Sequence, residues 1–320
     1  MITKPPFCPD QTCPNHLHPP STRWYSRDGT YHAQAHGEVP RFVCNTCGKK
    51  FSAQTFSLDY QVKRRVDYRY IFKQLKATGG IRHIARDLDV SVRLVLNRIT
   101  RLAHQALAVH RTLCSSLTLS EDLVADGFES FLLSQYFPNN ITLLVGKDSQ
   151  FLYTFDYAPL RRKGKMSERQ KRQRAVLEEK YRAPSNAVFT SFLRVLDEIE
   201  GYVAAKKASL PLTLYTDEHA TYPKALRSHS VLAHLHETGT VQHLRVSSRA
   251  PRTKSNQLFA VNYYDRELRK DNANHVRETV QFSRNAANCM ERMAVYMLYH
   301  NFYKPYRIRS GVEEVHAERA

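Results

Sequence analysis

The fold is decided by the stretch Leu212-Thr-Leu-Tyr-Thr-Asp-Glu-His-Ala-Thr-Tyr-Pro-Lys-Ala-Leu226. Its first part is apolar and β-prone, so we expect a buried strand that ends at Asp217, followed by a short helix. A carboxylate at the end of a buried strand points into the cleft beside the sheet, where a metal ion or a substrate can reach it. A single such aspartate more often caps the next helix, so its meaning depends on partners elsewhere in the chain.

Upstream of this stretch, the sequence predicts a run of strands. Residues 123–131 form the first expected strand, with Asp126 near its middle. Residues 141–145 and 151–155 follow, and turn residues precede or separate them. Three consecutive strands most simply form an antiparallel meander. One more strand is expected downstream, at 241–246.

Helices are expected both before and after the Asp217 strand in the sequence. Residues 185–208 show an amphipathic pattern, and 290–303 form a long apolar helix. Between them, Ser255 is expected to cap a further helix. Three polar residues of that helix fall on one side by i, i+4 and i+7 spacing: Asn262, Arg266 and Arg269. The chain is therefore expected to be an α/β protein, a mixed sheet flanked by helices.

The composition points to a nucleic-acid partner. The chain has 320 residues, a net charge of +18 and 42% hydrophobic residues, so we expect a folded protein that binds nucleic acid or, as the second choice, an anionic membrane surface. No apolar run reaches the roughly 18 residues of a membrane-spanning helix. The N-terminus lacks the apolar region of a signal peptide. We therefore expect a soluble, cytoplasmic protein with no membrane partner.

Four of the six cysteines lie in the first 47 residues. In a reducing compartment this clustering indicates a metal site rather than disulfides. The four thiolates expected to bind one structural Zn²⁺ are Cys8, Cys13, Cys44 and Cys47. A strand at 41–43 is expected to lead into the second cysteine pair, Gly48 permits a tight turn, and Phe51 begins a returning strand. This pattern resembles a zinc ribbon. The alternative is an unmetallated loop with incidental cysteines.

Histidines between the two cysteine pairs are further candidate ligands. They are His16, His18, His32 and His36. Each alone is more often a surface residue than a zinc ligand. Next to the second pair, Lys49 and Lys50 are expected to contact a DNA backbone.

Residues 60–113 are expected to be helical. After a first helix at 60–76, residues 81–88 predict a short helix, 89–91 a turn, and Ser91 the N-cap of a second helix that runs on to about residue 110. This pattern resembles a helix-turn-helix. The residues expected on the exposed side of its second helix, where they would contact DNA, are Arg93, Asn97, Arg98 and Arg101. The alternative is an ordinary helical hairpin whose basic side is merely solvated.

The segment 161–174 holds eight basic residues and one glutamate. It is expected to form a solvated basic helix or a mobile loop. We expect Arg161, Arg162 and Lys163 to lie near DNA and to contribute to backbone affinity only.

Taken together, the order of these motifs resembles the transposases of bacterial insertion sequences. The matching cassettes are Asp126-Gly-Phe-Glu-Ser-Phe131, Thr216-Asp-Glu-His-Ala-Thr-Tyr222, and Leu268-Arg269 followed by Arg277-Glu-Thr-Val-Gln-Phe-Ser-Arg284. The resemblance implies a zinc ribbon at 1–58 and a helix-turn-helix domain at 59–113. It further implies a ribonuclease-H-like catalytic domain at 119–305, with a basic helical insertion at 161–208, and a tail at 306–320.

The resemblance also implies the chemistry. Asp126, Asp217 and a third residue hold Mg²⁺ or Mn²⁺, and Arg269 positions a terminal phosphate. The third residue usually lies seven positions before the basic residue, which gives Asn262, as in the subgroup where Asn replaces Glu. Asp265 and Glu267 are the alternatives.

Such an enzyme cuts at the ends of its element and joins them to target DNA. It is implied to act in the bacterial nucleoid as a homodimer or higher oligomer. Two other functions stay open: a DNA-binding regulator without catalysis, in an inactive or domesticated copy, and a metal-dependent nuclease that cuts but does not join.

Overall fold

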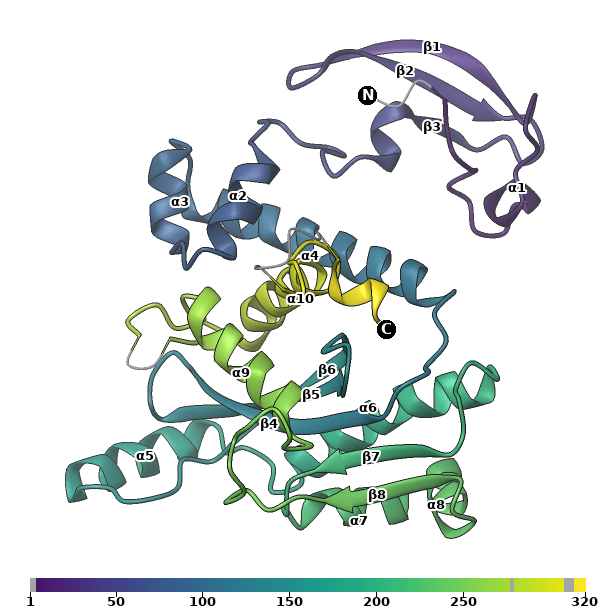
Figure 1. The fold of residues 1–320 in the computed structure, drawn as a ribbon. Helices are drawn as coiled ribbons and strands as arrows, with labels where there is room; N and C mark the ends of the chain where they lie inside the picture. Colours follow the sequence, from purple (N-terminus) through teal and green to yellow (C-terminus); the bar gives the residue numbers. More distant parts are fainter. Residues whose placement is uncertain (1–3, 277–278, 308–313) are drawn as a thin grey trace. The chain divides into compact units, whose positions relative to one another are not determined.

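The computed structural model describes residues 4–276, 279–307 and 314–320. The chain divides into two compact units, Met1–Tyr68 and Arg69–Ala320, which are described separately (Figure 1). In the described ranges, every helix is too short or too polar to cross a membrane.

The first unit is built on a three-stranded antiparallel sheet in the order β1-β2-β3. Its elements are α1 (Pro14–Leu17), β1 (Tyr25–Ala33), β2 (Gly37–Cys44), β3 (Lys50–Ser52) and the 3-10 helix η1 (Ala53–Phe56). The rings of Trp24, Phe42 and Phe51 form its small core. Gly48 has a φ of +74°, which permits the tight turn between β2 and β3.

The second unit contains a mixed five-stranded sheet in the order β6-β5-β4-β7-β8. The strands are β4 (Leu123–Leu132), β5 (Phe137–Gly146), β6 (Leu152–Pro159), β7 (Leu212–Thr216) and β8 (Val241–Arg245). The first three pair antiparallel, which confirms the expected meander. β7 runs parallel to both β4 and β8.

Helices cover both faces of this sheet (Figure 1). The helices α6 (Ala187–Ala204), α7 (Thr221–Ser228) and α8 (Ser230–Glu237) pack on one face. On the other face lie α9 (Phe259–Asp271) and α10 (Ala286–Phe302). Each face has its own apolar core, and the prediction of a mixed α/β fold with a helix-flanked sheet is confirmed.

A helical segment precedes the sheet. It consists of α2 (Tyr68–Leu75), α3 (Ile81–Asp87) and α4 (Val92–Cys114). Ser91 caps α4 as expected, because its hydroxyl accepts the N–H of Leu94 at 3.2 Å. The first helix is shorter than expected. Its buried residues are Ile71 and Leu75, whereas Lys63, Arg64 and Arg65 before it are exposed.

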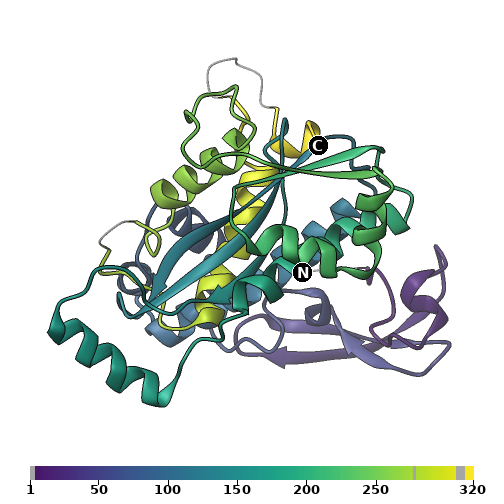
Figure 2. The same ribbon diagram turned by 90° about the horizontal axis from the view of Figure 1, so that it is seen from below.

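Residues between β6 and α6 form a peripheral arm. Its helix α5 (Glu168–Lys180) starts at a capping box on Ser167 and has no buried residue. In Figure 2 this teal helix stands away from the sheet. Within 161–208, only the part before α6 is peripheral, since α6 belongs to the core.

The C-terminal segment returns to the body of the second unit. Its short 3-10 helix η2 (His316–Glu318) places the His316 ring against that of His300, with the ring centroids 4.0 Å apart. Arg277, quoted above in a cassette, and residues 308–313 of the expected tail lie outside the described residues.

Candidate functional site

Strand pairing brings Asp126 and Asp217 together. In the parallel register of β4 and β7, Ala125 is paired with Thr216. Asp126 and Asp217 are the next residues on their two strands, and neighbouring strands lie about 4.8 Å apart. The two aspartates therefore occupy adjacent positions, although they are 91 residues apart in the sequence.

Alternation along the strands directs both carboxylates toward the face that α9 covers. Asp126 lies between Val124 and Phe128, which belong to the core under α9 and α10. Tyr215 also packs against that core, and Asp217 continues its alternation. Both side chains are therefore expected to face α9 at the end of the parallel strands.

Asp126, Asp217 and Asn262 line one cavity of about 1110 Å³. Its acidic lining residues are Asp126, Glu129 and Asp217. Its basic lining residues are Arg161, Arg162, Lys163, Arg182 and Arg252. A cavity lined by both kinds of charge suits a cation at the carboxylates and a polyanion at the basic side chains.

The carboxylate of Asp126 is held in an unfavourable electrostatic setting. Burial first, and then the charges of Asp217 and Glu129, raise its pKa to about 6, against the N–H of Gly127 and the charge of Arg252. Gly127 donates its N–H to Asp126 Oδ1 at 2.7 Å. Asp217 Oδ1 accepts the N–H of His219 at 2.8 Å. A divalent cation between the two carboxylates would relieve this repulsion.

Helix α9 offers three candidates for the third residue. Asn262 lines the cavity, and its side-chain amide has no hydrogen-bond partner among the described residues. Asp265 lies one helical turn later, and its Oδ1 is buried without a partner in the described structure. Burial first, and then the charge of Asp126, raise the pKa of Asp265 well above its usual range. Asn262 thus faces the cavity, while Asp265 is coupled electrostatically to Asp126.

Glu267 is committed to a structural role. Its carboxylate forms ion pairs with Lys304 and, at 2.9 Å, with Lys270. These two cations lower its pKa against the effect of burial. Glu267 is therefore not available as a third ligand.

Helix α9 begins later than expected. Its N-cap is Leu258 rather than Ser255. The side chain of Asn256 forms a turn by accepting the N–H of Leu258 at 2.8 Å, and Ser255 bonds to the hydroxyl of Thr253 instead. The helix register that carries Asn262 is unaffected.

Arg269 lies beside the strand of Asp126. Its guanidinium sits 4.6 Å from the centroid of the Phe128 ring and donates to the carbonyl oxygen of Glu129 at 3.1 Å. It also lowers the pKa of Asp265 against the larger effect of burial. Among the described residues, Arg269 is not part of the cavity lining.

One site residue was missed in the sequence. Tyr222, on α7, lines the same cavity although only 2% of its surface is exposed. Burial raises its pKa, and the charges of Asp126, Asp217 and Asp265 raise it further. The signal was the tyrosine that ends the Thr216–Tyr222 cassette, five positions after Asp217.

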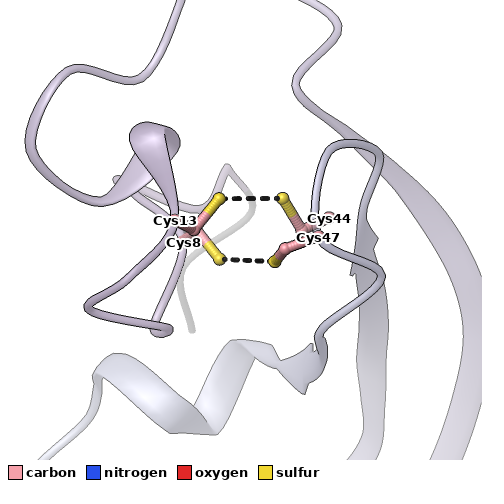
Figure 3. Close-up of side chains that lie close together, drawn as sticks. All are labelled: Cys8, Cys13, Cys44 and Cys47. Atoms are coloured by element: carbon pink, nitrogen blue, oxygen red, sulfur yellow. Dashed lines mark hydrogen bonds between the residues drawn. The ribbon is translucent and has the colours of Figure 1, made fainter.

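The four N-terminal cysteines form a single cluster in the first unit (Figure 3). Their Sγ atoms all lie within 4.8 Å of one another, with 3.6 Å between Cys8 and Cys47 and 3.8 Å between Cys13 and Cys44. A tetrahedral zinc ion with Zn–S bonds of about 2.3 Å sets S–S separations of about 3.8 Å. The geometry is compatible with a structural zinc site.

Hydrogen bonds prepare Cys44 for ionisation. Burial opposes the thiolate, but backbone N–H groups of Cys47 and Thr46 and the Asn15 amide lower its pKa to about 6. Asn15 Nδ2 donates to Cys44 Sγ at 3.5 Å. His16 is directed to the Cys8 carbonyl oxygen, at 2.7 Å from its Nδ1, and the cluster contains no histidine among the described residues.

The expected DNA-contacting residues of α4 do not all face outward. Arg93 and Asn97 are exposed and Arg101 is half-buried. Arg98 is only 5% exposed, and its Nη1 donates to Asn97 Oδ1 at 2.6 Å. The expectation of an outward Arg98 is wrong, because it follows the buried Val95 by three positions and so borders the inner face of the helix.

The remaining basic candidates lie on the surface. Lys49 and Lys50 are exposed, and Lys50 pairs with Asp28 at 3.3 Å. Arg161 forms a two-pronged ion pair with Glu178, which fixes the start of the arm to α5. Lys163 is exposed at the wall of the cavity.

A second group of metal-ligand side chains has another role. Asp197, Glu200 and His229 lie within 4.8 Å of one another. His229 Nδ1 accepts the N–H of Leu232 at 3.2 Å, so the proton of the neutral ring lies on Nε2, 3.2 Å from Asp197 Oδ1. A metal at Nε2 would move that proton to Nδ1 and remove the cap of α8. The group therefore ties α8 to α6.

Comparison with known proteins gives no relative. No protein-family model matches the chain, and no curated protein is significantly similar to it.

Proposed function

We propose that the chain is a DNA transposase of the type found in bacterial insertion sequences, with a ribonuclease-H-like catalytic unit. It binds the ends of its element, cuts there and joins the cut ends to target DNA. The observation that carries the proposal is the shared cavity of Asp126, Asp217 and Asn262, which is also lined by basic side chains. The antiparallel strands β6, β5 and β4, followed in the sheet by the parallel strands β7 and β8, support the ribonuclease-H-like assignment.

The donor set of the cavity fits Mg²⁺ or Mn²⁺. Asp126 and Asp217 supply two carboxylates at adjacent strand positions, and Asn262 supplies an unpartnered amide oxygen. Mg²⁺ prefers a small number of such oxygen ligands and keeps several waters. When bound, metal ions of this kind activate the attacking oxygen and stabilise the leaving oxygen of a phosphoryl transfer.

The residues around the donors act on the DNA. Arg162, Lys163 and Arg252 line the cavity, where they neutralise the phosphates on each side of the reacting bond. Tyr222 lines the same cavity, and its hydroxyl is able to donate a hydrogen bond to a phosphate oxygen. Arg269 orients the strand of Asp126 through the Glu129 carbonyl oxygen, so we assign it a positioning role.

In this proposal the rest of the chain recognises DNA. The cysteine cluster holds a structural zinc, and the exposed Arg93 and Asn97 of α4 read the terminal sequence. A homodimer or higher oligomer would bring two element ends together in the bacterial nucleoid.

The direct test incubates the purified protein with its own element's ends, Mg²⁺ and a target plasmid. We expect nicked ends and joined products, both lost in Asp126→Asn and Asp217→Asn, because charge is removed without a change of size. Binding of the ends should be retained in both variants, as measured by gel shift.

Two outcomes would contradict the proposal. Cleavage without any joined product would make the chain a nuclease. Specific binding of the ends with no cleavage, equal in the wild type and in Asp126→Asn, would make it a regulator.

A further inference from the structure

The second unit holds a second cavity, remote in sequence from the acidic one. It measures about 700 Å³ and lies between the α3–α4 pair and the segment 280–292. Its basic lining residues are Arg82, His83, Arg86, Arg284 and Arg292. Glu291 is its one acidic lining residue in the described chain.

Arg292 is the central group of this cavity, which we name the α3–α10 pocket. Its side chain is only 8% exposed, yet it lines the pocket. Its Nη1 donates to Asn274 Oδ1 at 3.0 Å, and within the described chain it forms no ion pair. Burial lowers its pKa to about 10. A buried guanidinium without a carboxylate is costly unless an anion meets it.

The other arginines add charge that is not neutralised. Arg82, Arg86 and Arg284 are exposed and form no ion pair with the described residues. His83 pairs at 3.1 Å with Asp87, and Asp87 is not a lining residue of the pocket. Glu291 is engaged through Oε1, which accepts the hydroxyl of Thr100 at 2.9 Å. The pocket therefore carries a clear excess of positive charge.

The walls of the α3–α10 pocket are held in place by hydrogen bonds. Ser283 is pinned to the end of β4, where its carbonyl oxygen accepts the N–H of Leu133 at 3.0 Å. Asn285 caps α10 by accepting the N–H of Asn288 at 2.8 Å. Opposite, Thr78 donates its N–H to the Asp271 carbonyl oxygen at 3.0 Å. The site is thus largely preformed.

The lining also contains an apolar part. It consists of Ile81, Val92, Leu96, Ile99 and Phe282. A cavity of this size falls in the range of small-molecule sites, which is roughly 300–1,000 Å³. It is much larger than a single phosphate group needs. Arginine forks bind phosphate, and aromatic and apolar side chains bind the faces of bases.

We propose that the α3–α10 pocket binds a phosphate-bearing nucleotide unit, with Arg292 and Arg284 on the phosphate and the apolar lining against the base. The shared chemistry has two sources, an unpaired nucleotide of DNA and a free nucleotide. Only the choice of DNA as the source rests on the proposed function.

The experiment measures binding by calorimetry and by thermal shift, with the full-length zinc-loaded protein and no added Mg²⁺. The probes are deoxyadenosine 5′-monophosphate, deoxyadenosine and inorganic phosphate. We expect the monophosphate to bind and raise the Tm, inorganic phosphate to bind more weakly, and deoxyadenosine to bind weakest. Because no metal-dependent step is measured, failure of the catalytic proposal leaves this result unaffected.

Variants locate the site. Arg284→Ala removes an exposed side chain and should weaken monophosphate binding at least about tenfold. Arg292→Lys keeps the charge but loses the fork, and should weaken it similarly. Arg227→Ala, exposed on α7 and outside the pocket, is the matched control and should change affinity less than about twofold.

Competition identifies the source. Displacement of the monophosphate by a single-stranded oligothymidylate would assign the pocket to DNA, and intact monophosphate binding without displacement would assign it to free nucleotides. Equal affinity for deoxyadenosine and its monophosphate would overturn the proposal. So would unchanged monophosphate binding in Arg284→Ala.

Discussion

At the scale of single residues, helix α9 carries two acidic side chains in opposite electrostatic settings. Glu267 is neutralised by two lysines. Asp265 is buried beside Asp126 with one oxygen unpartnered in the described structure. Groups of the second kind destabilise a fold and are typical of functional sites. The contrast gives a way to choose the third residue of the site.

We predict different effects on stability and on cleavage for three substitutions on α9. Asp265→Asn should raise the Tm, because it removes a carboxyl whose ionisation is opposed by burial and by the charge of Asp126, and should abolish cleavage if Asp265 is the third ligand. Asn262→Ala should leave the Tm nearly unchanged, and it should abolish cleavage if Asn262 is the third ligand. Glu267→Gln, the control, should lower stability by about 3 kcal/mol or more, since it leaves Lys304 buried without its partner.

Calorimetric melting and an end-cleavage assay separate these cases. If both Asn262→Ala and Asp265→Asn cleave at the wild-type rate, α9 supplies no third ligand, and the assignment fails for both residues.

At the scale of elements, the zinc cluster is predicted to hold the first unit together. Its core is small, and domains of this size usually need a metal or disulfides. Metal analysis should find about one zinc per chain, and Cys44→Ser with Cys47→Ser should remove it. Far-ultraviolet circular dichroism of the variant should show loss of the β1–β3 sheet. Undiminished zinc in the double variant would contradict the assignment.

The cap of α8 is a second prediction at this scale. His229→Ala removes the ring nitrogen that accepts the N–H of Leu232 at the start of α8. It also removes the ring nitrogen that donates to Asp197. It should lower stability by about 1–2 kcal/mol in urea unfolding and leave the metal content unchanged. Asp197→Ala, at an exposed side chain, should cost clearly less. A loss of bound metal in His229→Ala would contradict the tautomer argument.

Much of the element pattern was readable in the sequence, for identifiable reasons. The alternation around Asp126 and the apolar run before Asp217 predicted β4 and β7, and Ser91 marked the start of α4. Errors arose where local patterns compete. Ser255 looked like a helix cap, but Asn256 formed the preceding turn instead. Arg98 is buried because it lies three positions after the buried Val95, at the border of the inner face of α4.

The candidate site was predictable only in part. Asp126 and Asp217 were identified from the cassettes and Asn262 from its spacing to Arg269, and all three line the cavity. The coupling of Asp265 to Asp126 and the position of Tyr222 depend on burial and on three-dimensional proximity. The cassette contains Tyr222 and the helix pattern offers Asp265, but local spacing does not show that either residue is buried in the structure.

At the scale of the whole molecule, buried histidines make stability depend on pH. Burial lowers the pKa of His110, His243 and His316 to about 4 each. A histidine whose folded pKa lies below its unfolded value of about 6.5 stabilises the fold fully above that value. This stability is lost as the pH falls from about 6.5 to 4. Carboxyls with raised pKa, such as Asp126, act in the opposite direction.

A variant isolates the histidine contribution. His316 anchors the C-terminal segment, where its Nδ1 donates to the Ser149 carbonyl oxygen at 2.8 Å. Between pH 7 and 5, the wild type should lose about 2 kcal/mol more stability than His316→Gln, as measured by urea unfolding. Identical pH dependence in the two proteins would contradict this assignment.

The central claim is that Asp126 and Asp217 hold a divalent metal for phosphoryl transfer. Anomalous diffraction from crystals soaked in Mn²⁺ tests it most directly. We predict a peak about 2.0–2.3 Å from an oxygen of each carboxylate, with Asn262 or Asp265 as a further ligand. The peak should be absent in Asp126→Asn. An empty site in the wild type, with manganese bound elsewhere, would contradict the account.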